Sequence, residues 1–240
     1  MSGAIRIFFY NWPIYLGTWA AAAAVVALGA HLGATLLVVG GVVAALWSVW
    51  SLAVSFYIYD RSLLAGGTWV AKLVPAGTEA WAAIDAGLDA EVDLDASMPG
   101  HCIARLDIYD GAVVGRGSVE RARARTPRKH VAKLCPATAL ALPDASCDVV
   151  AVVFTAHEVQ TADDRDRFFR EVVRALRADG RVLLVEHHRD LPNFLAFGPG
   201  FLHFLPRREW LRVARAAGMI VRETMHVTPW VTALALEKAA

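Results

Sequence analysis

The chain has 240 residues, of which 56% are hydrophobic and only 20% are charged, and its mean hydropathy is +0.42. This composition is too apolar for an ordinary globular domain. The formal net charge of +1 provides no long-range attraction for nucleic acid, and the sequence contains no nucleic-acid-binding motif. We therefore expect no nucleic-acid partner.

The excess of apolar residues lies in positions 13–58, which contain no Lys, Arg, Asp or Glu. Two runs, about 13–30 and 34–58, are each long enough to cross a hydrocarbon core, which takes about 20 helical residues. A signal peptide has one short apolar run, and a hairpin in a soluble core has polar faces, so both alternatives fit less well. The pattern predicts a transmembrane helical hairpin within residues 1–65.

Basic residues lie on both sides of this hairpin, with Arg6 before it and Arg61 and Lys72 after it. Because positive charge favours the cytoplasmic side, both ends are expected there. We thus predict an integral protein of a bacterial-type inner membrane, with residues 66–240 forming a cytoplasmic domain. The pair Gly40-Gly41 permits close helix packing, so an oligomer formed through the hairpin is a further option.

Residues 66–240 alternate short apolar runs with amphipathic helices. Strands are expected at 81–86, about 101–106, 131–135, 148–154 and 181–186, with a helix in TADDRDRFFREVVRALRADG that Gly180 ends as a left-handed stop. Strands that are continuously apolar indicate a parallel sheet covered on both faces. The last two runs, MIVRETMHV and WVTALALEK, are joined so tightly that they predict an antiparallel pair.

This arrangement resembles the class I S-adenosylmethionine-dependent methyltransferases. The resemblance is carried by LALPDASCDVVAVVFTAHEV, by DRFFREVVRALRADGRVLLVEH and by REWLRVARAAGMIVRET, and it spans about residues 75–238. It implies an α/β fold with a Rossmann-like seven-stranded sheet and S-adenosyl-L-methionine as the cofactor. The sequence is most similar to the quinone-biosynthesis-like branch, which methylates small or lipid-like acceptors.

In this family the first strand ends in an acid followed by a glycine-rich turn. Asp85 and Gly87 match that pattern, whereas Asp89 and Glu91 replace the later glycines. An acid about 20 residues beyond the turn binds the ribose hydroxyls in this type of fold, and Asp107 has that spacing. Asp107 is therefore the strongest cofactor-binding candidate.

Four more residues are assigned to the cofactor by the same resemblance. Ile108 is expected to pack on the adenine, and Thr155 follows the fourth strand. The family often has an acid near the adenine amino group, but Pro136 stands there. That contact is therefore expected from the backbone of Ala137 or Thr138.

Candidate reacting groups follow the fourth and fifth strands, because functional groups project from the carboxyl ends of parallel strands. His157 is a candidate base, with a strand-end cap as the alternative, and Glu158 would orient it or begin the next helix. After the fifth strand, His188 and Asp190 are expected to face the cleft in preference to His187. A metal site formed by these residues has no spacing signature, so no metal is expected.

Two further segments suggest contacts outside the catalytic strands. The loop NFLAFGPGFLHF, residues 193–204, is apolar and aromatic, so we interpret it as a wall of the acceptor site or as a surface that touches lipid. The basic run RARARTPRKH, residues 121–130, is a solvated helix face or a contact with anionic headgroups.

Together these features predict a membrane-anchored methyltransferase that acts on a hydrophobic or lipid-like acceptor, such as a quinone or a lipid headgroup. The altered glycine turn and Pro136 leave two alternatives open. One is a non-catalytic membrane adaptor on a degenerate fold, and the other is transfer of a different group from the same cofactor.

Overall fold

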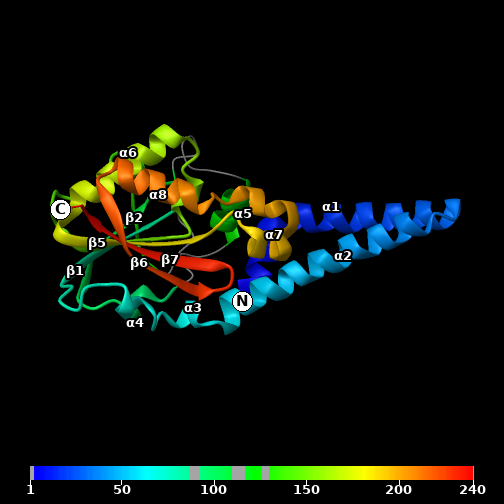
Figure 1. The fold of residues 1–240 in the computed structure, drawn as a ribbon, viewed down its shortest axis with the longest axis horizontal. Helices are drawn as coiled ribbons and strands as arrows, with labels where there is room; N and C mark the ends of the chain where they lie inside the picture. Colours follow the sequence, from blue (N-terminus) through cyan, green and yellow to red (C-terminus); the bar gives the residue numbers. More distant parts are fainter. Residues whose placement is uncertain (1–2, 87–91, 110–116, 126–129, 240) are drawn as a thin grey trace.

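The computed structural model describes residues 3–86, 92–109, 117–125 and 130–239, and it contains a long helical hairpin and an α/β domain (Figure 1). The hairpin consists of α1 (Gly3–Leu32) and α2 (Thr35–Phe56). Figure 1 shows both helices projecting from one side of the sheet, with the turn between them farthest from it. Gly87, Asp89 and Glu91 of the expected glycine turn lie outside the described residues.

The first helix starts about ten residues earlier than the apolar run suggested. It begins at Gly3 and is kinked at Asn11, whose φ of −118° and ψ of 16° are not helical. Pro13 explains the kink, because its ring lacks an N–H and collides with the preceding turn. The turns before the kink lie beside the α/β domain, which is why they tolerate Arg6.

The base of the hairpin is tied together by Asp60. Beyond α2 the chain continues as a short π-helix, Tyr57–Arg61. The Asp60 carboxylate accepts hydrogen bonds from the backbone N–H of Gly3 at 2.7 Å and of Ala4 at 3.1 Å. A carboxylate at a helix N-terminus satisfies donors that lack helical partners and interacts favourably with the helix dipole.

The sheet has seven strands in the order β3-β2-β1-β4-β5-β7-β6. The strands are β1 (Ala80–Asp85), β2 (His101–Asp107), β3 (Lys133–Leu134), β4 (Cys147–Val153), β5 (Leu176–His187), β6 (Met219–Thr228) and β7 (Val231–Lys238). The first five are parallel, whereas β7 is antiparallel to both β5 and β6. The predicted Rossmann-like sheet and its antiparallel pair are confirmed.

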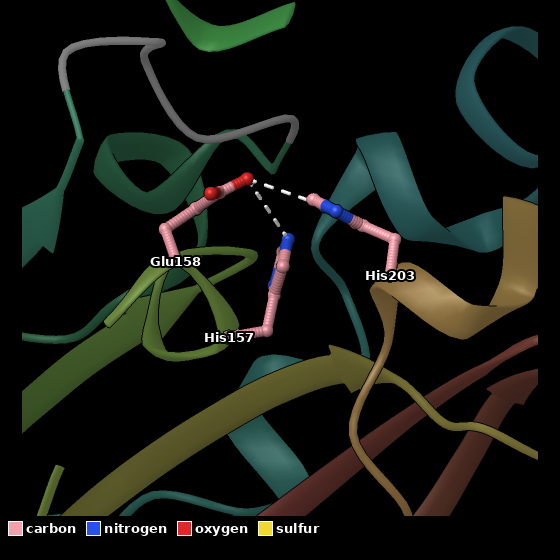
Figure 2. A group of neighbouring side chains, drawn as sticks. All are labelled: His157, Glu158 and His203. Atoms are coloured by element: carbon pink, nitrogen blue, oxygen red, sulfur yellow. Dashed lines mark ion pairs between the residues drawn. The ribbon is translucent and has the colours of Figure 1, made fainter. Parts of the chain in front are cut away.

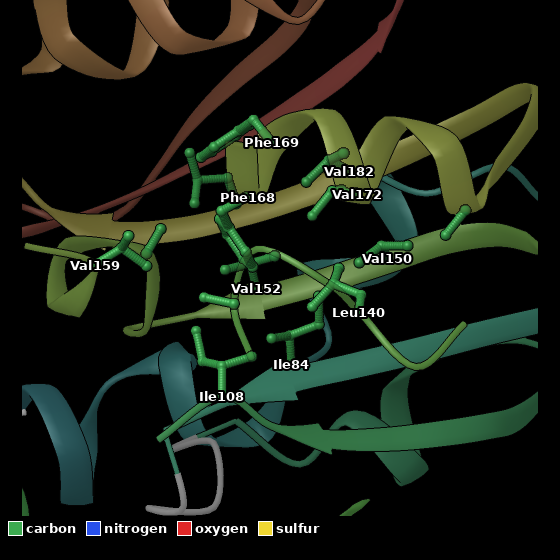
Figure 3. Packing of buried hydrophobic residues seen from close by; sticks show 14 of the residues in the cluster. Ile84, Ile108, Leu140, Val150, Val152, Val159, Phe168, Phe169, Val172 and Val182 are labelled. Atoms are coloured by element: carbon green, nitrogen blue, oxygen red, sulfur yellow. The ribbon is translucent and has the colours of Figure 1, made fainter. Parts of the chain in front are cut away.

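Helices cover both faces of this sheet. The remaining helices are α3 (Leu63–Gly66), α4 (Leu94–Ser97), α5 (Gly117–Arg125), α6 (Ala162–Ala175), α7 (Leu191–Phe197) and α8 (Arg207–Ala216). On one face α6 inserts Phe168 and Phe169 into the larger core cluster (Figure 3). Trp210 of α8 belongs to the same cluster. On the other face Val54 of α2 and Ile58 of the π-helix that follows join a second core cluster, so the base of the hairpin belongs to the domain core.

The prediction that Gly180 stops α6 in a left-handed conformation is wrong. The helix ends at Ala175, the chain passes directly into β5, and Gly180 lies within that strand without a positive φ. A Cβ at Gly180 would lie 3.0 Å from the carbonyl oxygen of Cys147 and 3.0 Å from Leu176 Cδ2. Close packing against β4 therefore accounts for the glycine.

We predict that Phe168→Ala destabilises the protein by about 3 kcal/mol or more, because it leaves a cavity at a fully buried position. Thermal unfolding in detergent should shift down by about 6–12 °C. Ile220→Ala, on the exposed side of β6, is the matched control and should cost less than about 1 kcal/mol. Equal shifts for the two variants would contradict the assignment of Phe168 to the core.

Candidate active site

A cavity of about 940 Å³ lies between the hairpin and the carboxyl ends of the strands. Its wall on the sheet side is formed by the ends of β1, β4 and β5 and the residues that follow β4. The hairpin contributes the opposite wall, including Tyr10, Tyr15 and Trp47, and the segment 197–204 closes one side. The loop expected to form an acceptor-site wall therefore does line a cavity.

Two carboxylates end adjacent strands on the side where the cofactor was expected. Asp85 at the end of β1 is paired in register with Asp107 at the end of β2, and both are buried. Asp85 lines the cavity, whereas Asp107 is not among its lining residues. Both acids therefore end their strands as expected, Asp85 from the family resemblance and Asp107 from its spacing, while their contacts with the cofactor stay predictions.

Arg123 of α5 holds Asp107, and this contact was not foreseen from the sequence. Its Nη1 atom donates to Asp107 Oδ1 at 3.0 Å and to the carbonyl oxygen of Ala86 at 2.7 Å. The guanidinium also lies 4.2 Å from the centre of the Tyr109 ring, a cation–π contact. A single side chain therefore links α5 to the ends of β1 and β2.

The other predicted cofactor residues are not all equally close to the cavity. Thr155 is buried and lines it, with its hydroxyl donating to the carbonyl oxygen of Val153 at 2.8 Å. Ile108 is fully buried in the larger core cluster beside Ile84 (Figure 3). Ala137 and Thr138 lie in the turn after β3, where Ala137 is also part of the core. Their contacts with adenine stay predictions.

Three ionisable side chains, His157, Glu158 and His203, meet at the cavity wall (Figure 2), and Glu186 contacts His157 without lining the cavity. Nδ1 of His157 lies 2.7 Å from Glu186 Oε2, and Nε2 of the same ring lies 3.3 Å from Glu158 Oε1. Nε2 of His203 lies 3.3 Å from that same Glu158 oxygen. His157, Glu158 and Glu186 are buried, and His203 is half-buried. The predicted residues His157 and Glu158 thus contact each other through their side chains, and His203 joins them from a distant segment.

The carboxylates control the charge of His157. Burial by itself lowers the pKa of this imidazole, but Glu186 and Glu158 outweigh it and raise the pKa to about 10. Burial raises the pKa of Glu158, and its hydrogen bonds with His157 and His203 outweigh that effect, holding this pKa well below its usual range. In this arrangement His157 is a charged hydrogen-bond donor, which does not suit the expected role of a base.

His187 faces the cavity, which reverses the orientation expected at the end of β5. Its ring is stacked between Phe154, at a centroid distance of 5.1 Å, and Phe204, at 4.7 Å. Phe154 reaches this position with a φ of 50°, a left-handed conformation that is strained for an aromatic residue. Burial lowers the pKa of His187 to about 3, so the ring is neutral.

The tautomer of His187 follows from its partners. Its Nδ1 lies 2.9 Å from the carbonyl oxygen of Trp230, which can only accept, so Nδ1 carries the proton. Nε2 must then accept, and the Tyr59 hydroxyl at 2.9 Å donates to it. This hydrogen bond joins the end of the hairpin to the end of β5 at the cavity wall.

His188 and Asp190, both predicted catalytic residues, do not line this cavity. Asp190 caps α7, with its Oδ1 accepting from the backbone N–H and the side-chain amide of Asn193. His188 is buried, and its Nε2 has no hydrogen-bond partner among the described residues. Their catalytic roles remain predictions without support from a cavity contact.

We predict that stability falls as the pH decreases from about 6.5 towards 4, in part because of His188. Burial lowers its pKa to about 4; Asp190 opposes this shift, whereas Arg207 and His226 add to it. Between these pH values the unfolded chain binds a proton that the folded protein does not, so acidification favours unfolding. His187 contributes in the same direction.

The measurement compares melting temperatures of wild type and His188→Gln across this pH range. The variant should show a shallower decrease, because glutamine does not titrate. His101, exposed at the start of β2 and replaced by glutamine, is the control and should leave the slope unchanged. Parallel curves for wild type and His188→Gln would contradict the buried neutral state of His188.

One segment of the chain matches a known protein family. Residues 103–184 match the family described as "Methyltransferase domain". No curated protein matches the sequence.

Among solved structures, an S-adenosylmethionine-dependent methyltransferase from Aquifex aeolicus is 15% identical with a TM-score of 0.52, covering 75% of this chain and 91% of that one. A second such methyltransferase, from Thermotoga maritima, is 18% identical with a TM-score of 0.51, covering 80% and 100%. The mitomycin 7-O-methyltransferase MmcR is 16% identical with a TM-score of 0.52, covering 97% and 68%.

At identities this low, the solved structures are evidence for the fold alone. The family match is evidence for a methyltransferase domain in the matched residues. The fold similarity agrees with the seven-stranded sheet described above. Residues 103–184 thus match a methyltransferase domain, and the chain has the fold of solved S-adenosylmethionine-dependent methyltransferases.

Proposed function

We propose that the α1–α2 hairpin anchors this methyltransferase in a membrane and that the enzyme methylates a hydrophobic acceptor bound at the base of the hairpin. One observation carries the proposal. The cavity at the strand ends is completed by the hairpin itself, so an acceptor in this cavity touches the catalytic domain and the membrane-type helices together.

The exposure of the hairpin supports its insertion in lipid. Both helices have apolar windows of spanning length, and only 17% of each window is buried. Large apolar side chains such as Leu32, Leu36 and Leu46 are more than half exposed. A helix in a soluble core would be mostly buried, whereas a helix in lipid presents apolar groups outwards.

A second apolar surface lies beside the hairpin base. Leu191 and Leu195 of α7 and Leu202 of the following 3₁₀-helix are 67%, 55% and 58% exposed. This group is fixed to the hairpin, because Trp47 of α2 donates its indole N–H to the carbonyl oxygen of Leu195 at 2.9 Å. Exposed leucines at this level fit contact with the acyl boundary of a bilayer.

The chemistry of the cavity wall supports an apolar acceptor with a polar reacting end. Ile7, Ile14 and Trp47 present apolar surface on the hairpin side, while His157 and His187 present polar groups at the strand ends. Such a site binds the apolar part of a ligand and orients the few polar atoms at its reacting end. A quinone or a lipid headgroup with its tail towards the bilayer has this shape.

Methyl transfer is an in-line displacement at the sulfonium carbon, so positioning and exclusion of water do most of the work. We assign Asp85 and Asp107, which end the adjacent strands β1 and β2, to the amino-acid and ribose portions of the cofactor. An acceptor in the cavity would then lie next to the cofactor, because Asp85 lines the cavity. No proton acceptor is required when the acceptor arrives ionised.

The proposal is tested with full-length protein in lipid nanodiscs, methyl-labelled S-adenosylmethionine and a lipid extract of bacterial membranes. We expect label to enter the organic phase. Ala44→Trp should raise the KM for the acceptor about tenfold or more, because Ala44 lines the cavity and an indole would fill it. Ala23→Trp, on the exposed side of α1, is the control and should leave the KM unchanged.

Two results would contradict the proposal. Release of the protein from membranes by alkaline carbonate would exclude a spanning hairpin. Label found only in water-soluble products, with the KM unaffected by Ala44→Trp, would place the acceptor elsewhere. Absence of any cofactor binding by folded protein would instead favour the non-catalytic adaptor.

We predict separately that Asp107→Asn weakens binding of S-adenosylhomocysteine by about 10- to 100-fold, because a hydrogen bond to a charged group contributes about 1.5–3 kcal/mol. Isothermal titration calorimetry measures this directly. Asp163→Asn, exposed in the first turn of α6, is the matched control and should bind like wild type. Unchanged affinity in Asp107→Asn would remove this residue from the cofactor site.

A further inference from the structure

We propose that His157, Glu158 and His203 bind a divalent transition-metal ion at the cavity wall. Figure 2 shows the three side chains converging from two separate segments. His157 and Glu158 belong to the 3₁₀-helix Ala156–Glu158 after β4, and His203 ends the 3₁₀-helix Gly198–His203. All three line the cavity, so a bound ion would face the space assigned to the acceptor.

The spacing of the donor atoms is close to that of a metal site. Each Nε2 atom lies 3.3 Å from Glu158 Oε1, and all three donor atoms lie within 4.8 Å of one another. Ligands about 2.1 Å from an ion are separated by about 3.4 Å in a tetrahedral arrangement. The two nitrogen–oxygen distances already match this value, and His203 is half-buried, so a small inward rotation of its ring completes the set.

A supporting carboxylate is also in place. Glu186 Oε2 lies 2.7 Å from Nδ1 of His157, the nitrogen that does not face the other ligands. Glu186 is 1% exposed and also accepts from the His157 backbone N–H at 3.3 Å, so its position is fixed. Histidines that bind metals usually donate the other ring N–H to such a carboxylate, which sets the tautomer and aims Nε2 at the ion.

The charge of the cluster favours a cation. Glu158 and Glu186 are both buried, and two carboxylates taken out of water are costly unless opposite charge compensates them. A divalent ion compensates both while leaving the imidazoles neutral. The alternative is protonation of the imidazoles, and the experiment below separates the two.

The donor set also indicates which ions fit. Two imidazoles and one carboxylate suit zinc, cobalt, iron or manganese and are a poor site for magnesium, which prefers oxygen ligands. With three protein ligands, coordination positions stay open towards the cavity. If the proposed function holds, an ion held by these three residues would bind the oxygen of a hydroxyl-bearing acceptor and would make that hydroxyl lose its proton to solvent more readily.

The site is tested with Co²⁺ as the probe, in tag-free full-length protein stripped with chelator and kept in detergent. We expect a visible ligand-field spectrum that saturates at one ion per chain and is abolished by competing Zn²⁺, but not by Mg²⁺. His203→Ala and Glu158→Gln should each weaken Co²⁺ binding about tenfold or more. His101→Ala and Glu223→Gln, both exposed and outside the cavity, are the matched controls and should bind like wild type.

Each preparation is also titrated with S-adenosylhomocysteine, so that failure of the metal site can be distinguished from failure of the enzyme assignment. Protein that binds S-adenosylhomocysteine but gives no Co²⁺ spectrum would overturn the metal site and leave the protonated cluster. Undiminished Co²⁺ binding in both His203→Ala and Glu158→Gln would show that the ion binds elsewhere, which also overturns it. His203→Ala is the more informative variant, because its half-buried side chain is removed at little cost to folding.

Discussion

The burial of the end of α2 beneath the sheet is the contact on which the rest of the structure depends. Val54 and Ile58 share one core cluster with Val149 of β4 and Val185 of β5, so the hairpin is continuous with the domain and is not carried on a flexible linker. Apolar burial is non-directional, but here it is supplemented by the hydrogen bonds of Asp60 to the start of α1. Together they hold both helices against the carboxyl edge of the sheet, and the cavity is the space left between them.

The same arrangement explains why so many ionisable groups are buried at one end of the protein. Parallel strands end at a common edge, and the hairpin covers that edge with apolar surface, so the polar residues after β4 and β5 lose access to water. They are stabilised only by one another or by what binds among them. His187 stays neutral between two aromatic rings, whereas His157 lies between two carboxylates. Two histidines 30 residues apart in the chain thus have very different surroundings.

Much of the fold was predictable because its signals are local. Apolar runs with short connections indicated the strands, helical periodicity around Phe168 and Phe169 indicated α6, and the tight link before β7 indicated the antiparallel pair. The position of Asp107 at a strand end followed from its spacing, and that of Asp85 from the resemblance to the family. The site was predictable only in part, since His157 and Glu158 were identified, but their partners Glu186 and His203 were not assigned to them. Gly180 was misjudged because its role depends on packing against β4.

The sequence by itself determined the layout of a long apolar hairpin followed by an alternating α/β domain, and it placed acids and histidines after the correct strands. Those properties depend on the order and periodicity of neighbouring residues. Only the tertiary structure decided that His187 and not His188 faces the cavity, that Arg123 holds Asp107, and that His203 reaches Glu158. Each of these contacts joins segments distant in the chain, and their geometry is set by how the helices and the sheet pack, which no local pattern encodes.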